Sequence, residues 1–379
     1  MLSLVTSSLS LSGCPTSGLS SLEMSATGLA KPGQSEARGE SSPVSGDQLS
    51  KRVDRILREN LDGRRLDVTQ QGAWQVLHGI LAYGQAFEVE TPAGVQPAVD
   101  YLLEGGPLEG FEPSIGDPLP AQTGGSNDMA GRSTTGVRFE FAPSTKTGQG
   151  HRDQWLAILA QSNLTPSDPV VVRGRKFQVD DVVRQTEFDI PLNLEEEFSW
   201  TLIGLLAFRD TDHVWTARDG NDYSVDLLLE VELNQSIADS VCGGTHRLNA
   251  IAMALAKRRS EGKPINGVWQ MAEQQIAASI EDARMNQNPD GSYSLAYLHR
   301  PGWARDLSEQ LGTTGHVLEF VSLAADDETL QSAWVRRSVT RICDLLDACR
   351  DIDLECGVLY HALHGLQEYQ TRLKRMSSE

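Results

Sequence analysis

Six short segments of the chain are apolar at helical spacing, and most of them open with glycine and a polar or aromatic residue. They are GAWQVLHGILAYG from Gly72, GQGHRDQWLAILA from Gly148, FSWTLIGLLAF from Phe198, CGGTHRLNAIAMALA from Cys242, GTTGHVLEFVSLA from Gly312 and CGVLYHALHGLQEY from Cys356. Together they contain six of the eight histidines of the chain. Repeated apolar elements that carry the same polar residue predict equivalent helices facing a common centre.

The intervening segments predict a second set of helices. Amphipathic helices are expected over 48–60, 266–286 and 334–352. In the first half, the pattern strand, turn, strand, helix occurs three times, in FEVETPAGVQPAVDYLLE, VVVRGRKFQVDDVVRQTEF and HVWTARDGNDYSVDLLLEVEL. Their turns contain glycine, as hairpin turns require, and their helices are expected to begin near Ala98, Asp180 and Asp226. The predicted fold class is all-α: an α/α toroid of about six outer–inner helix pairs with small β-hairpin insertions in the first half.

Three regions are predicted along the chain. Residues 1–47 are rich in serine, glycine and proline, which is typical of a disordered segment. Residues 48–376 are expected to form the single toroid domain. Within it, residues 105–147 are a long loop insertion containing one expected strand, Val137–Phe141. Because long loops are uncommon unless they are functional or disordered, this insertion is a candidate lid over a cavity.

Charge and hydropathy limit the classes of partner that the protein is expected to bind. The chain has 379 residues and a formal net charge of −19, which speaks against a nucleic-acid or anionic-membrane surface. No apolar run approaches the roughly 20 residues of a transmembrane helix. Leu11 to Cys14 resembles a lipoprotein cleavage box, but the preceding residues contain no lysine or arginine. A cytoplasmic protein with a disordered tail is therefore expected; the alternative is a lipid anchor at Cys14 and a place in the cell envelope.

Three histidines are expected in the first turns of their helices, where glycines leave backbone N–H groups free. If the inner helices run parallel, these turns meet at one mouth of the toroid. His316 and Glu319 lie three residues apart on one helical face and form a candidate base with its orienting carboxylate. The candidate catalytic residues are His151, Asp153, His246, His316 and Glu319. The candidate substrate-binding residues are His78, Trp155, Trp200, Arg247 and His361.

Structural roles are the alternative for each of these residues. A histidine on an inner helix can simply hydrogen-bond a neighbouring helix end, and the tryptophans can be core packing. No HExxH or CxxC spacing is present, so no metal ligands are predicted, and no cofactor is expected because nucleotide-binding loops are missing. Cys242, beside two glycines, is a candidate activated thiol, although a buried cysteine is the more common reading of such a position.

The motif Gln287-Asn-Pro-Asp-Gly-Ser-Tyr293 resembles the Q-x-x-D-G-S/G-aromatic turn of terpenoid cyclases and protein prenyltransferases, which are α/α toroids. The resemblance implies a structural turn between helices, and it covers this motif and the helix-pair rhythm. The D-x-D-D and D-D-x-x-D motifs of those enzymes are absent, so their activity is not carried over. The CGGTHRL and GTTGH segments resemble an uncharacterised bacterial family.

Two functions follow from this pattern. The first is an enzyme with a central polar cavity that uses histidine and carboxylate as acid and base. Its expected ligand is a small molecule or glycan, because sugar epimerases, glycoside hydrolases and polysaccharide lyases use helical toroids in this way. The second is a non-catalytic binding or scaffold protein of the cell envelope. An enzyme requires the histidines to converge on an open cavity, whereas a scaffold should show them paired and the centre filled.

Overall fold

The computed structural model describes residues 46–119, 135–142, 150–194 and 197–378. The chain divides into two units, residues 1–43 and residues 44–379, and the first unit lies outside the described residues. The predicted disordered segment, including the lipid-anchor candidate Cys14, lies outside them up to residue 45. Among the described residues, no helix combines the length and the apolar character that a membrane span needs.

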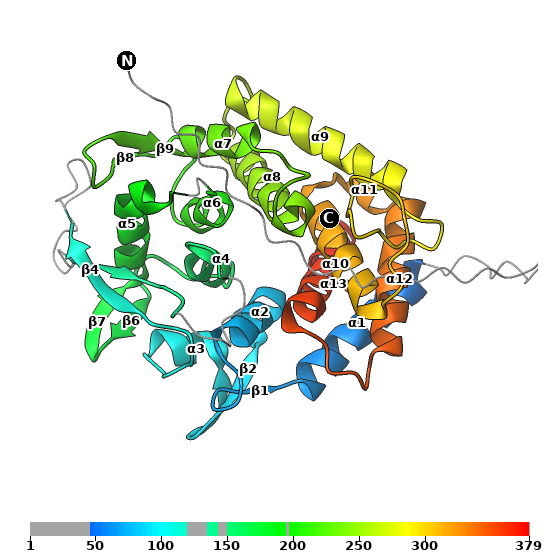
Figure 1. Ribbon diagram of the computed structural model, residues 1–379, viewed down its shortest axis with the longest axis horizontal. Coiled ribbons are helices and arrows are strands. Elements are labelled where there is room, and N and C mark those ends of the chain that lie inside the picture. The colour runs from blue at the N-terminus through cyan, green and yellow to red at the C-terminus, as the bar shows by residue number, and fades with distance from the viewer. Residues whose placement is uncertain (1–45, 120–134, 143–149, 195–196, 379) are drawn as a thin grey trace, which may run out of the picture. The chain divides into compact units, whose positions relative to one another are not determined.

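Six helices of the described unit are buried along most of their length. They are α2 (Ala73–Tyr83), α4 (Gln154–Ala160), α6 (Ser199–Leu206), α8 (Thr245–Ser260), α10 (Leu307–Ala324) and α13 (Cys356–Met376). Each overlaps one of the six apolar segments, so the prediction of a helix in every segment is confirmed. Each helix packs against the next in this order, and α13 packs against α2 (Figure 1).

A second series of helices alternates with the first along the chain. They are α1 (Gly46–Gly63), α3 (Ala98–Leu103), α5 (Val179–Asp189), α7 (Val225–Asn234), α9 (Val268–Asn286) and α12 (Ala333–Ala348). Helix α1 is amphipathic: Leu49, Val53, Ile56 and Leu57 recur at helical spacing and are its buried residues. The mostly helical class is thus confirmed. A one-turn helix, α11 (Asp327–Leu330), and the 3₁₀ turns η1 (Gly84–Ala86), η2 (Ile190–Leu192) and η3 (Val241–Gly244) complete the helical elements described.

The three predicted hairpin–helix units are also present. The antiparallel pairs are β2 (Glu88–Thr91) with β3 (Gly94–Pro97), β6 (Pro169–Val172) with β7 (Arg175–Gln178), and β8 (Val214–Thr216) with β9 (Asp222–Ser224). They lead directly into α3, α5 and α7. β1 (Leu66–Asp67) adds a parallel strand to β2. At the last unit, the Ser224 hydroxyl accepts a hydrogen bond from the backbone N–H of Leu227 and so caps α7.

The insertion at 105–147 is described in part. It contains β4 (Ser114–Pro118) paired antiparallel with β5 (Thr135–Arg138), so the expected strand at Val137–Phe141 begins two residues earlier and ends three residues earlier than predicted. β5 packs against α5. The side chain of Arg138 explains part of this packing, because it donates hydrogen bonds to Asp189 at the end of α5 and to Asp117 of β4.

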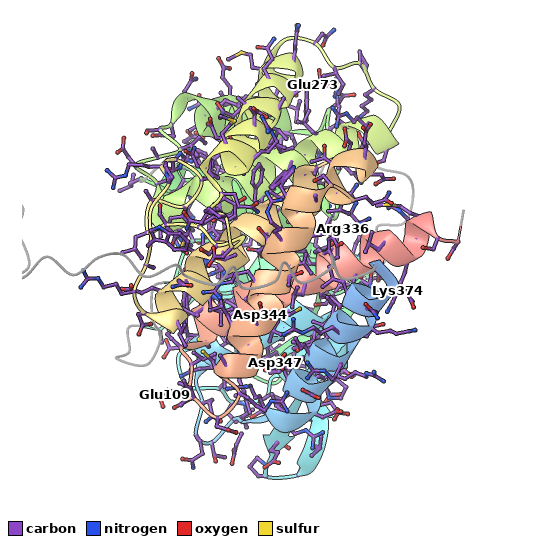
Figure 2. All side chains as sticks on the ribbon, turned by 90° about the vertical axis from the view of Figure 1, so that its right-hand side faces the viewer. Glu109, Glu273, Arg336, Asp344, Asp347 and Lys374 are labelled. Atoms are coloured by element: carbon purple, nitrogen blue, oxygen red, sulfur yellow. The ribbon has the colours of Figure 1, made fainter. Side chains whose placement is uncertain are left out.

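Ion pairs join the helices where α1 meets α12. Arg52 of α1 lies 2.7 Å from carboxylate oxygens of both Asp344 and Asp347, and Arg55 lies 3.0 Å from Asp347. Figure 2 shows Asp344 and Asp347 on α12, facing the viewer beside α1. Both helices also pack their apolar faces on the buried series, α1 against α13 and α12 against α10.

The motif at Gln287–Tyr293 forms the expected structural turn after α9. Gly291 has a φ of 90°, and a Cβ there would lie 2.4 Å from the carbonyl oxygen of Arg337 in α12. The buried Tyr293 donates its hydroxyl hydrogen bond to the carbonyl of Ala283, and Gln287 donates to the carbonyl of Trp334. The turn therefore ties the end of α9 to α12.

Candidate functional site

Five histidines that lie far apart in the sequence meet in one place. The histidine cluster consists of His78 of α2, His151 before α4, His246 of α8, His316 of α10 and His361 of α13. The ring centroids are 4.0 Å apart for His316 and His361, 5.1 Å for His246 and His361, and 5.4 Å for His246 and His316. The ring centroid of His78 lies 5.3 Å from that of His361, and the ring centroid of His151 lies 5.8 Å from that of His246. The structure thus brings together all five histidines that the sequence analysis singled out.

Two of the expected positions, those of His316 and His151, are wrong in their local structure. His316 is not in the first turn of its helix, because α10 begins at Leu307, five residues before Gly312. The carboxylate of Asp306 caps this start by accepting hydrogen bonds from the N–H groups of Ser308 and Glu309. His246 does lie in the first turn of α8, whereas His151 precedes α4 by three residues.

Glycines inside α10 and α13 allow these two helices to approach closely. A Cβ on Gly315 would lie 2.8 Å from the Cα of Ala362, and one on Gly365 would lie 2.8 Å from the backbone nitrogen of Glu319. Any side chain at these positions would push the helices apart. The close approach explains why histidines of α13 reach the side chains of α10.

Glu319 holds two of these imidazoles at once. Its Oε2 lies 2.8 Å from Nδ1 of His361 and its Oε1 lies 2.5 Å from Nδ1 of His364, with all three residues buried. An orienting carboxylate at Glu319 was predicted, but its partner is wrong: the Nδ1 of His316 is bonded to the carbonyl oxygen of Gly312 at 2.8 Å instead. The ring of His316 therefore bonds the carbonyl four residues earlier in its own helix, α10. The rings that reach the carboxylate of Glu319 come from the facing helix, α13.

The electrostatics separate His364 from the cluster. Burial alone would lower the pKa of His364, but its hydrogen bonds to Glu319 and Glu368 raise that pKa to about 10. Burial alone would raise the pKa of Glu319, yet the two imidazoles bring it well below its usual value. The pair is therefore ionic at neutral pH, an imidazolium against a carboxylate.

Four histidines of the cluster, His78, His246, His316 and His361, are neutral because burial lowers their pKa values. Burial lowers the pKa of His78 to about 3, and its Nδ1 lies 2.7 Å from the carbonyl oxygen of Trp74, to which it donates. Burial, together with the neighbouring imidazoles, lowers the pKa of His246 well below 6.5, and burial also lowers that of His316 and His361. Neutral imidazoles keep a lone pair on one ring nitrogen, which can accept a proton or bind a metal ion.

A left-handed turn positions the thiol of Cys242 beside this cluster. Cys242, Gly243 and Gly244 have φ values of 53°, 63° and 75° in succession. A Cβ on Gly243 would lie 2.5 Å from the ring of Tyr297, so only glycine fits there. Burial raises the pKa of the Cys242 thiol. The glycines that the sequence places before His246 thus serve to fold Cys242 back toward the histidine.

A cavity of about 440 Å³ opens onto the cluster. Its lining includes the five histidines, Cys242, aromatic side chains of Trp74 and Tyr297, and two carboxylates, Glu309 and Glu355. Glu355 accepts a hydrogen bond from the indole N–H of Trp74 at 3.0 Å. A volume of this size is within the range of small-molecule sites.

The remaining predicted residues lie outside this lining. Trp155 is buried between Phe111 and Phe141 at ring distances of 4.3 and 5.4 Å, as a core residue. Asp153 accepts a hydrogen bond from Thr201 and lines a second cavity, of about 390 Å³.

Two further candidates, Trp200 and Arg247, also lie outside the cavity lining. Trp200 packs against the ring of His246 at 4.9 Å without lining the cavity. The guanidinium of Arg247 donates to the backbone carbonyl of Glu232 and lies 3.4 Å from its carboxylate. The described part of the candidate lid, at 105–119 and 135–142, contributes no residue to the histidine-lined cavity.

The sequence analysis gave no site role to Trp74 and Tyr297, which line the cavity, or to His364, which bonds Glu319. It selected Cys242 as a candidate activated thiol. The signal for Cys242 was its spacing, Cys-Gly-Gly-Thr-His, which puts a thiol and an imidazole four residues apart across two glycines. Nothing in the sequence shows that Tyr297 packs on Gly243.

No protein-family model matches the chain, no curated protein matches it, and no solved structure matches it.

Proposed function

We propose that the described helical unit is an α/α toroid of six outer–inner helix pairs. What supports this proposal is the sequence of contacts, in which α2, α4, α6, α8, α10 and α13 each pack against the next and the last packs against the first. The second helix series alternates with these along the chain. A crystal structure tests the proposal: a gap between any two neighbours of the inner series would overturn it.

We propose, further, that the protein is an enzyme whose active site is the histidine-lined cavity. The observation that carries this is the pair His361–Glu319. The carboxylate binds Nδ1 of a buried imidazole whose ring lines an open cavity. A carboxylate in this position orients the ring, favours the tautomer with hydrogen on Nδ1 and stabilises the imidazolium that forms when the ring takes up a proton.

In the proposed mechanism His361 is the general base. Its Nδ1 donates to Glu319, so Nε2 carries the lone pair that accepts a proton from the substrate. Returning this proton to the product or leaving group regenerates the neutral ring, with Glu319 remaining ionised throughout. His78, whose ring lies 5.3 Å from that of His361, stays neutral and contributes a second lone pair to the cavity wall.

The proposed substrate is a small carbohydrate. Trp74 and Tyr297 offer aromatic faces, and Glu309 and Glu355 offer acceptors for hydroxyl groups. Aromatic faces beside hydrogen-bonding carboxylates suit a ligand with apolar C–H faces and a rim of hydroxyls. The alternative of a non-catalytic scaffold predicts paired histidines and a filled centre; the open cavity, and the two unpartnered nitrogens of His246, favour the enzyme.

A carbohydrate library tests the proposal in the full-length protein. Each compound is incubated with wild type, His361→Ala and Glu319→Gln, and both turnover and thermal shift are recorded. We expect turnover by wild type to fall about 10²–10⁴-fold in His361→Ala, the usual contribution of a general base. The matched control is His213→Ala, because His213 also bonds a buried carboxylate, Glu187, but does not line the cavity.

Two outcomes would overturn the enzyme. One is turnover that is equal in wild type and in a His361→Ala variant shown by circular dichroism to be folded. The other is a library in which no compound is turned over and no compound shifts the melting temperature of wild type more than that of His361→Ala.

A further inference from the structure

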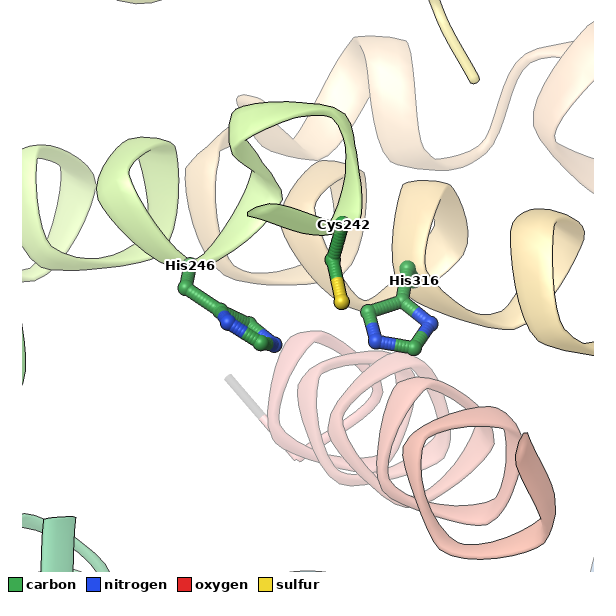
Figure 3. A group of neighbouring side chains, drawn as sticks. All are labelled: Cys242, His246 and His316. Atoms are coloured by element: carbon green, nitrogen blue, oxygen red, sulfur yellow. The ribbon is translucent and has the colours of Figure 1, made fainter. Parts of the chain in front are cut away.

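Three potential metal ligands converge at the edge of the cavity. The Sγ of Cys242 and one ring nitrogen each of His246 and His316 all lie within 4.8 Å of one another. Figure 3 shows the thiol between the two rings, with the residues supplied by the turn before α8, by α8 and by α10. This is the one such group of three histidine, cysteine or carboxylate residues found among the described residues.

Three of the four ring nitrogens of these histidines have no hydrogen-bond partner in the described part of the chain. Both ring nitrogens of His246 and Nε2 of His316 are buried without a hydrogen-bond partner, and each residue is only 6% exposed. Burying an imidazole nitrogen without a partner is costly, because its interaction with water is lost and not replaced. Buried nitrogens that are left open in this way indicate that a bound group completes the site.

The hydrogen bond made by Nδ1 of His316 determines which nitrogen of this ring can bind a ligand or metal ion. Its Nδ1 lies 2.8 Å from the carbonyl oxygen of Gly312 and must donate to it, which leaves the lone pair on Nε2. Metal-binding histidines commonly donate their other N–H to a backbone carbonyl or a carboxylate, since this orients the ring. His361, stacked on His316 at 4.0 Å, has the same arrangement toward Glu319.

We propose that Cys242, His246 and His316 bind one divalent transition-metal ion of the zinc class. A thiolate with two imidazoles suits zinc and its neighbours cobalt and nickel, whereas magnesium and calcium require oxygen ligands. In tetrahedral zinc sites the ligand atoms are about 3.5 Å apart, so atoms that lie within 4.8 Å of one another need to close in by no more than about 1.3 Å on binding. Three protein ligands leave a fourth position for water or substrate, as in catalytic zinc sites.

The metal site goes beyond the proposed acid–base chemistry and does not depend on it. A bound ion would supply Lewis acidity and a more acidic water to the same cavity. His361 and His78 are not among the three ligands and remain available to move protons. Either proposal can therefore fail while the other holds.

Cobalt and zinc binding by the full-length protein tests the proposal. After treatment with a chelator, Co²⁺ is added, and the visible d–d bands and the near-ultraviolet thiolate-to-cobalt band are followed. Zinc affinity is then measured by competition. We expect one equivalent of Co²⁺ with a thiolate band, loss of that band in Cys242→Ala, and zinc affinity at least about 100-fold weaker in His316→Ala. The matched control is Cys349→Ala, since Cys349 is also a free cysteine but is buried at the end of α12.

A second measurement on wild type keeps the test decisive if a variant fails to fold. Among the four described cysteines, Cys242 is partly exposed and the other three are buried. Zinc should slow alkylation of Cys242, read by peptide mass spectrometry. No cobalt band, equal binding by Cys242→Ala and Cys349→Ala, or no protection of Cys242 would each overturn the metal site.

The same preparations separate the two proposals. Turnover that survives the chelator but requires His361 means acid–base catalysis without the metal. Metal binding that requires Cys242, in a protein that turns over nothing, means a metal site without the proposed enzyme.

Discussion

Glu187 and Glu319 are both buried carboxylates with an imidazole nitrogen at 2.8 Å, but their surroundings differ. Glu187 also binds the guanidinium of Arg209, at 2.6 Å, and its histidine, His213, lies on the hairpin side with a side chain 22% exposed. Among the described residues, the ionic partners of Glu319 are two imidazoles, both buried, and one of them lines the cavity.

The difference shows what distinguishes a structural histidine–carboxylate pair from a candidate catalytic one. Arg209 neutralises Glu187 permanently, since a guanidinium does not lose its proton in proteins. The charge on Glu319 is balanced instead by His364, an imidazolium that can titrate. A histidine–carboxylate hydrogen bond alone therefore does not identify a catalytic pair. Glu187 has a permanent countercharge in Arg209, whereas Glu319 has none among the described residues and one of its histidines lines the cavity.

The largest stability effect is expected on removal of Glu319. Glu319→Ala should lower the free energy of unfolding by ~3–5 kcal/mol at pH 7, because it leaves His364 buried without its main countercharge. Glu187→Ala should cost less, since Arg209 keeps its bond to Asp180 at 3.0 Å. Urea denaturation of both variants measures this, and equal losses would erase the contrast between the clusters.

The same pair gives a pH dependence with a defined sign. The pKa of His364 is raised to about 10 in the folded protein, so its stabilisation is complete below 6.5 and is lost as the pH rises through 10. The pKa of Glu319 is lowered in the folded protein, so its contribution to stability is present at neutral pH and is lost as the pH falls through this lowered pKa. The cost of Glu319→Ala should therefore shrink above pH 10, and a cost that is unchanged there would contradict the ion pair.

An acid-linked loss of stability is the next effect. The pKa of His78 is lowered to about 3, so the unfolded chain binds a proton between pH 6.5 and 3 that the folded protein does not. This linkage costs about 3 kcal/mol between pH 7 and pH 4. In chelator-treated protein, His78→Phe should lose less stability than wild type over this interval by that amount. Parallel stability curves for the two proteins would show that His78 is not buried neutral.

The smallest effect is expected at the His213–Glu187 pair. His213→Ala should lower the free energy of unfolding by about 1 kcal/mol, because the ring is partly exposed and Arg209 continues to neutralise Glu187. Thermal denaturation measures the change, and the cobalt titration should match that of wild type. Loss of metal binding in His213→Ala would mean that the two clusters are coupled.

Local structure was largely predictable from periodicity. The six apolar segments, the amphipathic helices and the three hairpin–helix units are all found, because each pattern is set by neighbours in the chain. Two helix starts differ from the prediction: α4 begins three residues after His151, and α10 begins before Gly312 and Gly315, which had indicated the start of a helix. Those glycines lie inside the helix because Val358 and Ala362 of α13 pack directly on them.

The candidate site was predictable by residue type but not by partner. The histidines were selected from their repeated placement, and Glu319 from its spacing. The assignment of Glu319 to His316 failed because residues three apart on one helix share a face, yet the facing helix α13 comes close enough to take the carboxylate. Trp155 and Arg247 were selected as site residues. In the structure, Trp155 packs in the core and Arg247 forms an ion pair with Glu232.

The amino-acid sequence by itself determined the helices, the hairpins and the presence of many inward histidines, since these follow from spacing along one segment. Only the tertiary structure decided that Cys242 meets His316, and that His361 rather than His316 takes Glu319. Those contacts join residues 74 and 42 positions apart. They depend on how closely the backbones of separate helices can approach, which local periodicity does not encode.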